Sequence, residues 1–209
     1  MLPMDGLRAR QKFKRNNRIL ETAAELFKQS GYEAVKMENI ASASEVSIGT
    51  IYNYYQNKGD LLLAIVAMEV HEILQAGNAV VDKPPLNAID AVDTLVGIYY
   101  NHSLVYLSKE MWRVAMSIST QQPTSPFGIT YSELDSALAN QTCELITKLQ
   151  KLDLIKADCD IRSIGQVIFN NLNMMFIGFV KDEEMTLAKL RKILRKQTRA
   201  IVSVYVPSQ

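Results

Sequence analysis

The sequence predicts an all-α protein, and three observations support this prediction. Helix breakers are scarce, since the 209 residues include only nine Gly and six Pro. Leu, Ile, Ala and Met alternate with charged residues along most of the chain, as in amphipathic helices. Apolar residues make up 48% of the chain, which is enough to bury a sizeable core. We therefore expect about nine helices, with a three-helix unit at the N-terminus and a helical bundle after it.

The first predicted helix covers residues 13–30. Ile19, Ala23 and Phe27 recur on one face of this segment at helical spacing. The pattern stops at Gly31, a residue type that commonly ends helices because it adopts the left-handed conformation without strain. The segment therefore predicts one amphipathic helix with a defined C-terminal end.

Two short helices are predicted next. Met37 and Ile40 indicate the second helix. Ser47 is a good N-cap residue, and we expect the third helix to run from Ser47 to Tyr55 with Ile51 on its buried face. Three short helices in little more than forty residues form a trihelical unit.

Longer helices are predicted for the rest of the chain. Asn57 followed by Asp60, and Asn87 followed by Asp90, have the spacing of capping pairs at helix starts. Pro-containing segments interrupt the helical pattern between them. The predicted helices cover residues 58–80, 87–122 as two helices, 127–154, 160–180 and 186–205.

The start of the chain is basic, although the whole chain has a formal net charge of only +1. Residues 1–18 contain one acid, Asp5, and six bases: Arg8, Arg10, Lys12, Lys14, Arg15 and Arg18. Such a segment is either a solvated tail or one that reaches toward phosphate groups.

Several classes of protein are not expected from this sequence. No run of about 18 apolar residues and no signal-peptide pattern is present, so we expect a soluble cytoplasmic protein without membrane contact. Cys143 and Cys159, like His71 and His102, are too far apart to form a short metal-binding or redox motif. A redox role for either cysteine stays open, although such thiols usually belong to the core. With no catalytic constellation and no cofactor motif, we do not expect an enzyme.

The outward side chains of the third predicted helix are mostly polar or aromatic, which suits a DNA major groove. They are Ser47, Ile48, Thr50, Asn53 and Tyr54. Gly49 lies in the first turn, where glycine costs roughly 1 kcal/mol relative to alanine. Close approach of a phosphate or a base to the backbone would explain its presence.

The string Val46-Ser47-x-Gly49-Thr50-Ile51-Tyr52-x-Tyr54-Tyr55, followed by Asn57-Lys58-x-Asp60-Leu61-Leu62, extends this pattern. With Ser30-Gly31-Tyr32 and Ile40-Ala41, it resembles the TetR family of bacterial transcription regulators over residues 13–62. The resemblance implies a homodimer that reads a palindromic double-stranded operator and a C-terminal domain that binds a small inducer. The DNA-binding residues that it implies are Lys36, Ser47, Ile48, Gly49, Thr50, Tyr52, Asn53, Tyr54 and Lys58, with Tyr52 and Lys58 on phosphates.

This resemblance divides the chain into three parts: a basic arm (1–12), a helix-turn-helix domain (13–57), and a helical domain for ligand binding and dimerisation (58–209). Two residues depart from the family pattern. Glu45 stands where the family usually has glycine, so either the turn avoids the left-handed region or Glu45 is strained. Lys36 stands where Thr or Ser commonly caps the second helix, which removes the cap and adds a cation near the phosphates.

The third predicted helix has no side chain for the commonest guanine contact, because residues 47–54 contain no Arg, Lys or Gln. Asn53 is its best bidentate partner and suits adenine, while Ile48 and the Thr50 methyl group suit thymine methyl groups. We therefore predict that the base pairs contacted by this helix are rich in A·T.

Large adaptable residues of the helical domain are candidates for an inducer pocket, although each of them could be ordinary core. These candidates are Tyr99, His102, Tyr106, Trp112, Met116, Phe127, Tyr131, Phe169, Asn173 and Phe176. Their composition favours an apolar or aromatic inducer. His102 would take a polar partner if it were buried, and a ligand could provide one.

The last predicted helix is rich in Lys and Arg but also has an apolar stripe, so we interpret its basic side as a solvated outer face. In the TetR family the last two helices form the dimer interface. The dimer residues expected here are Val167, Ile168, Leu172, Met175, Phe179, Leu190, Leu194 and Ile201.

The leading hypothesis is a transcription regulator, in the form of a repressor that a small molecule releases from DNA. The alternative is a helical ligand-binding or protein-interaction module whose DNA-binding unit has decayed, for which Glu45 and Lys36 are the only hints. An activator is not distinguished from a repressor by the sequence.

Overall fold

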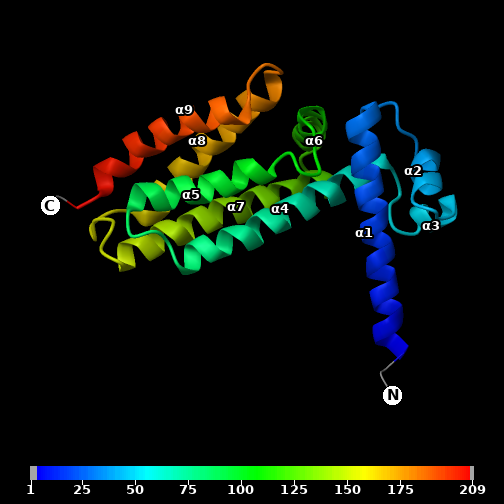
Figure 1. Cartoon of the computed structure of the whole chain (residues 1–209), viewed down its shortest axis with the longest axis horizontal. Helices are drawn as coiled ribbons and strands as arrows, with labels where there is room; N and C mark the ends of the chain where they lie inside the picture. Colours follow the sequence, from blue (N-terminus) through cyan, green and yellow to red (C-terminus); the bar gives the residue numbers. More distant parts are fainter. Residues whose placement is uncertain (1–3, 208–209) are drawn as a thin grey trace. The chain divides into compact units, whose positions relative to one another are not determined.

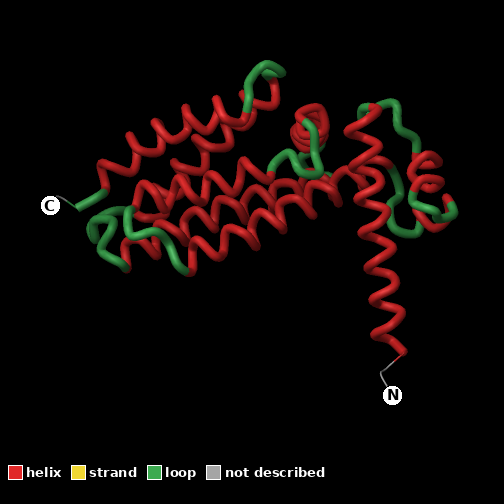
Figure 2. Tube along the Cα trace, in the orientation of Figure 1, coloured by secondary structure: helices red, strands yellow, loops and turns green. Residues whose placement is uncertain are grey.

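A computed structural model describes residues 4–207 of the chain. Within this range the backbone forms nine α-helices, one short 3-10 helix and no strand (Figures 1 and 2). The helices are α1 (Met4–Ser30), α2 (Met37–Ala43), α3 (Ile48–Tyr52), α4 (Lys58–Asp82), α5 (Ala88–His102), α6 (Lys109–Gln121), α7 (Pro126–Lys151), α8 (Ile161–Lys181), α9 (Leu187–Val202) and η1 (Ser203–Tyr205). The predicted all-α class is confirmed.

The chain divides into two compact units. The first comprises Met1–Met68 and Tyr106–Ile129, and the second comprises Glu69–Val105 and Thr130–Gln209. Helix α4 contributes to both, because its residues up to Met68 belong to the first unit and the rest to the second. The boundary predicted after residue 57 therefore falls inside the first unit, which also contains α6.

Helix α1 begins much earlier than the sequence pattern predicted. Ile19, Ala23 and Phe27 are fully buried, and the helix ends before Gly31 with φ +80°, as expected. It starts at Met4 rather than at residue 13, so the described part of the predicted basic arm is helical; residues 1–3 lie outside the described residues. The apolar pattern marks only the buried part of a helix, whereas Arg, Lys and Gln extend it by their own helix propensity.

Helices α2 and α3 share the core of the first unit. Ile40 of α2 and Ile51 of α3 are both fully buried. The Ser44 hydroxyl donates a hydrogen bond of 2.6 Å to the Ile40 carbonyl, which satisfies a buried polar group at the end of α2. Helix α3 ends at Tyr52 rather than at Tyr55, so the predicted C-terminal boundary is wrong by three residues.

The second unit is held by buried polar contacts as well as apolar packing. The Gln141 side chain on α7 donates hydrogen bonds of 2.7 Å to the Leu74 carbonyl and to Asn78 Oδ1 on α4. It also accepts a hydrogen bond of 2.9 Å from the Tyr99 hydroxyl on α5. A side chain on Gly77 would collide with Gln141, so this glycine makes room for the network that joins α4, α5 and α7.

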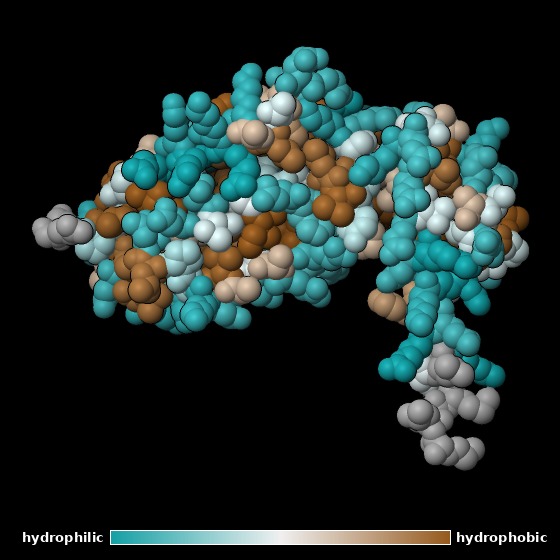
Figure 3. Space-filling view, viewed as in Figure 1, coloured by the Kyte–Doolittle hydropathy of each residue, from teal (hydrophilic) through white to brown (hydrophobic). Residues whose placement is uncertain are grey.

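Helix α8 of the second unit is long and rich in apolar residues. Among the described residues, Ile161–Lys181 is the one helix long and apolar enough to cross a membrane by length and composition. Ile168, Leu172 and Phe179 on this helix are buried within the chain and belong to the core of the second unit. In Figure 3, hydrophilic side chains are prominent along the N-terminal half of α1 and over much of α9.

Candidate nucleic-acid interface

The start of α3 is fixed by the cap that the sequence predicted. The Ser47 hydroxyl accepts a hydrogen bond of 3.1 Å from the Thr50 backbone N–H. It also lies 2.8 Å from the Thr50 hydroxyl. The two hydroxyls thus contact each other at the start of α3, and the predicted contact of the Thr50 methyl group with thymine stays a prediction.

The outer face of α3 is exposed in the first unit. Ile48 is 36% exposed and Tyr52 49% exposed, and Ser47 and Asn53 are also exposed. At Gly49, the nearest atom to an added Cβ would be Ser47 Oγ at 3.9 Å. Packing inside the chain therefore does not require glycine here, and the close approach of a phosphate or a base stays a prediction.

The inner side of the same segment anchors it to α1. Tyr55 is buried, and its hydroxyl donates a hydrogen bond of 2.7 Å to Asn16 Oδ1. Burial raises the pKa of the Tyr55 hydroxyl to about 12, so it stays a neutral donor. Tyr55 therefore belongs to the core of the first unit.

Tyr54, which follows α3, is less exposed than Ile48 and Tyr52 on the outer face of that helix. Its hydroxyl donates a long hydrogen bond of 3.4 Å to the Lys12 carbonyl, and Lys12 Nζ lies 5.8 Å from the centre of its ring. The ring also stacks on Tyr55 with a centroid distance of 6.2 Å. Tyr54 therefore packs against α1, and Tyr52 is the more accessible of the two tyrosines predicted to bind DNA.

The Lys58 side chain is held by contacts within the first unit. Its ammonium group donates hydrogen bonds of 2.8 Å to the Tyr32 carbonyl and 3.1 Å to the Glu33 carbonyl. It also lies 4.4 Å from the centre of the Tyr32 ring and 3.8 Å from the Glu33 carboxylate. Lys58 thus ties the start of α4 to the segment between α1 and α2, and its contact with phosphate stays a prediction.

Glu45 and Lys36, the two residues that depart from the family pattern, are both accommodated by local contacts. Glu45 has φ +54°, so of the two alternatives the strained one is observed. Its carboxylate lies 3.5 Å from Arg18 on α1, in an exposed ion pair. Lys36 precedes α2 without a side-chain cap, and Asn39 Oδ1 instead accepts a hydrogen bond of 3.0 Å from the Lys36 N–H.

The basic residues near the start of the chain lie on exposed positions of α1. The exposed set is Arg8, Arg10, Lys12, Lys14, Arg15 and Arg18. The contacts of Lys12 with Tyr54 and of Arg18 with Glu45 place this part of α1 beside the segments that flank α3.

Sequence reasoning missed Glu110 of α6, which supports the first unit from a distant part of the chain. Its carboxylate accepts a hydrogen bond of 3.2 Å from the Tyr32 N–H, just after α1 ends, and lies beside Gly31. No signal within residues 13–62 points to a partner 78 positions away along the chain.

The ten predicted pocket residues are divided between the two units. Tyr106, Trp112, Met116 and Phe127 belong to the first unit, and Tyr99, His102, Tyr131, Phe169, Asn173 and Phe176 belong to the second. Several have partners inside the protein. Asn173 donates a hydrogen bond of 3.0 Å to Asp135 Oδ2, and the two nitrogens of His102 lie 3.5 Å from Glu69 and 3.1 Å from Glu72. The polar partner expected for His102 thus comes from α4, and the pocket itself stays a prediction.

The predicted dimer residues are mostly core of the second unit. Ile168, Leu172, Phe179, Leu190 and Leu194 are at most 4% exposed, so the prediction that they contact a partner is wrong. A hydrophobic stripe read from sequence does not distinguish the face toward the chain's own core from the face toward a second copy. Val167 is 53% exposed, Met175 and Ile201 are partly exposed, and Met174 on the same helix is 66% exposed.

The cysteines are free and partly buried. Cys143 packs against Gly165 of α8, where an added Cβ would lie 2.7 Å from Cys143 Cα, and burial raises the pKa of its thiol. Among residues 4–207, no group of three or more His, Cys, Asp or Glu side chains is arranged to hold a metal ion.

Part of the first unit matches the sequence profile of a known protein family. Residues 19–65 match the family profile described as bacterial regulatory proteins, tetR family. The HTH-type transcriptional repressor KstR of Rhodococcus jostii is 32% identical over 88 residues, which is 42% of this chain and 42% of the repressor. The chain thus matches less than half the length of that relative.

Solved structures share the fold over nearly the whole chain. A TetR-family regulator from Mesorhizobium loti covers 94% of this chain and 98% of its own, with a TM-score of 0.72 and 17% identity. FadR of Thermus thermophilus, a repressor solved in complex with lauroyl-CoA, covers 93% of this chain and 96% of its own, with a TM-score of 0.64 and 17% identity. At these identities the likeness concerns the fold.

Proposed function

Because the chain belongs to the TetR family of bacterial regulatory proteins, we propose that it is a repressor that binds operator DNA as a homodimer and is released by a small molecule. One observation carries this proposal: a short, properly capped helix α3 exposes its polar and aromatic face while its other face is buried. An intact α3 also argues against a decayed DNA-binding unit, the alternative left open by the sequence.

Operator recognition is proposed to rest on few side chains. Asn53 contacts adenine, Ile48 and Thr50 contact thymine methyl groups, and Tyr52 contacts phosphate. In a dimer the two α3 helices would read half-sites about 34–36 Å apart or a multiple of that spacing. A palindromic operator with A·T pairs at the contacted positions follows from this arrangement.

The test is binding to DNA taken from upstream of the protein's own gene, measured by fluorescence anisotropy at several salt concentrations. Asn53→Ala should weaken specific binding about 10- to 100-fold, since a good bidentate contact contributes roughly 1–3 kcal/mol. Gln75→Ala, on an exposed position of α4 in the second unit, is the matched control and should bind as the wild type does. Equal binding by both variants, or binding that salt does not weaken, would reject the proposal.

The dimer is proposed to form through the outward faces of α8 and α9. Val167 and Met174 are exposed on α8, and Ile201 is partly exposed on α9. Exposed apolar side chains on adjacent helices are the surface that a second copy would cover. Analytical ultracentrifugation at micromolar concentration should show a dimer for the wild type and a monomer for Met174→Glu, with unchanged helix content.

The inducer is proposed to be apolar or aromatic and to bind in the second unit. Since α4 supplies residues to both units, a ligand beside it could alter the placement of α3 if it binds the two arrangements with unequal affinity. Lauroyl-CoA, the ligand of the Thermus thermophilus relative, is the first compound to test. An inducer of this kind should weaken operator binding, and tight binding without that effect would contradict the mechanism.

A further inference from the structure

A strongly charged groove lies between α5 and α9 in the second unit. It has a volume of about 540 Å³ and is lined by Asp93, Ala188, Arg191, Lys192, Arg195, Lys196 and Arg199. Five of these seven side chains are cationic and one is anionic, on a chain whose total formal charge is +1. The operator-binding face belongs to the other unit, so this charge serves no step proposed above.

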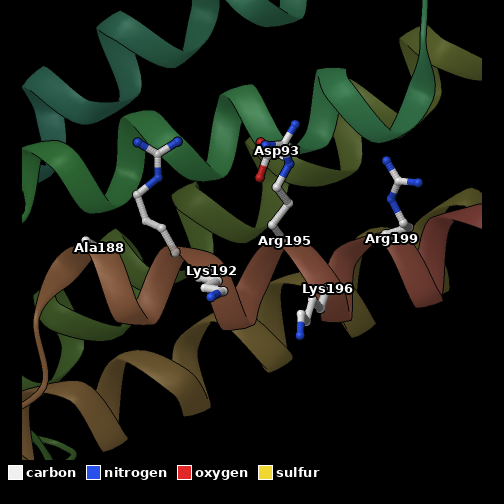
Figure 4. A pocket seen from close by; sticks show the side chains of 7 residues that line it. Asp93, Ala188, Lys192, Arg195, Lys196 and Arg199 are labelled. Atoms are coloured by element: carbon white, nitrogen blue, oxygen red, sulfur yellow. Dashed lines mark ion pairs between the residues drawn. The ribbon is translucent and has the colours of Figure 1, made fainter.

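The arginines form a row along one side of α9. Arg191, Arg195 and Arg199 are four residues apart, so their positions repeat about every 6 Å along the helix axis. Figure 4 shows Arg195 and Arg199 extending from α9 toward α5, whereas Lys192 and Lys196 do not reach toward α5. The groove thus presents planar guanidinium groups, which match phosphate oxygens better than ammonium groups do.

Helix α5 has a glycine and an asparagine where the first arginine of the row lies against it. An added Cβ at Gly97 would lie 2.8 Å from the Arg191 guanidinium, so the glycine lets this side chain lie against α5. Arg191 also donates a hydrogen bond of 3.2 Å to Asn101 Oδ1. The first arginine is therefore held in place before any ligand arrives, which reduces the entropy lost on binding.

The charge within the groove is poorly compensated. Helix α9 contains no acidic residue, and like charges four residues apart destabilise a helix. Asp93 forms the one ion pair in this groove that the structure records, 3.4 Å from Arg195. A multivalent anion would relieve the repulsion that Asp93 leaves in place.

We propose that the groove binds a small organic polyphosphate of nucleotide size, with its phosphates on Arg195 and Arg199 and on the prepositioned Arg191. The volume suits such a molecule, since ligand sites typically measure about 300–1,000 Å³. A second copy of this chain does not fit, because a symmetric contact would bring two like-charged grooves together. The buried apolar face of α9, with Leu190 and Leu194 fully covered, has nothing to insert into a lipid surface.

The experiment is titration of the full chain with ATP and with inorganic tripolyphosphate, by isothermal calorimetry at physiological salt. The double variant Arg195→Gln, Arg199→Gln should bind each probe at least about tenfold more weakly. Lys151→Glu, an exposed residue of α7 outside the groove, is the charge-matched control and should bind as the wild type does.

Asp93→Asn provides a test in the opposite direction. It removes the only carboxylate of the groove and frees Arg195, so binding of both probes should tighten several-fold. A merely solvated basic face would show weak binding that falls equally in the double variant and in the Lys151→Glu control, and this result would overturn the proposal.

A third arm uses a short DNA duplex without the operator sequence. If this duplex competes for the groove more strongly than ATP, and the double variant abolishes that competition, the groove is a nucleic-acid site and the small-polyphosphate proposal is wrong. Operator affinity measured in parallel keeps the result independent of the proposed repressor function, because the groove variants leave α3 intact.

Discussion

The exposed face of α3 and the interior of the second unit differ in how their residues are determined. On α3, short-range chemistry sets the geometry: the Ser47 cap starts the helix, and Ile51 turns one side toward the core. In the second unit, Gln141 contacts α4 and α5 from a third helix, and no local pattern predicts those partners. Residues for recognition can therefore be read from a short motif, whereas residues that line or close a ligand pocket depend on packing between distant segments.

The largest effect should separate the two sides of α3. Ile51→Ala removes a fully buried side chain and should lower the free energy of unfolding by about 2–5 kcal/mol. Ile48→Ala, on the 36% exposed side of the same helix, should change stability by less than about 0.5 kcal/mol while weakening operator binding. Urea unfolding and DNA titration of both variants measure the contrast, and equal stability losses would contradict the assignment of inner and outer faces.

A second pair of variants tests how closely α8 packs against its neighbours in the second unit. Gly165→Ala places a Cβ 2.7 Å from Cys143 Cα and should destabilise by about 1–3 kcal/mol, because α7 and α8 must move apart. Gly178→Ala, later on α8 with no atom within 4 Å of the new Cβ, should stabilise by about 0.5–1 kcal/mol. Thermal unfolding followed by circular dichroism distinguishes them, and a stabilising Gly165→Ala would refute the close crossing.

Residues other than glycine adopt the left-handed backbone conformation in both units, so the cost of this conformation can be compared between them. Glu45 has φ +54° and Asp153 has φ +58°. Glu45→Gly should stabilise by about 1 kcal/mol, since the lost ion pair with Arg18 is exposed and contributes little. Asp153→Gly should gain less, because Asp tolerates this conformation better than Glu. A larger gain at Asp153, measured by urea unfolding, would contradict this ranking.

The smallest effect concerns a buried carboxylate of the second unit. Burial raises the pKa of Asp135, although the hydrogen bond from Asn173 opposes this shift. When the pKa of an acid is higher in the folded state than in the unfolded state, the folded state binds the proton more tightly. The free energy of unfolding therefore falls as the pH rises from the unfolded-state pKa through the folded-state pKa. The Tm at pH 7 minus the Tm at pH 4 should therefore be larger for Asp135→Asn than for the wild type, as thermal unfolding at the two pH values would show. An equal difference in the two proteins would indicate that Asp135 is well solvated.

The motif of the first unit was predictable because its signals are local. The Ser47 cap, the buried Ile51 and Tyr55, and the glycine after α1 lie where the sequence places them. The length of α1 was not predictable from hydrophobic pattern, since residues 8–15 of this helix are exposed. The shorter α3 follows from backbone hydrogen bonding, in which the Tyr54 N–H bonds to the Ile51 carbonyl in a tighter turn.

The sequence by itself determined the helical class, the capped reading helix and its lack of a guanine-binding side chain, because each depends on residue type and spacing within a few turns. Only the tertiary structure decided that Lys58 binds the Tyr32 and Glu33 carbonyls, that Leu190 and Leu194 face the core, and that three arginines of α9 line a groove beside α5. These outcomes depend on which helix lies against which. An amphipathic stripe shows that a face is buried, but not what buries it.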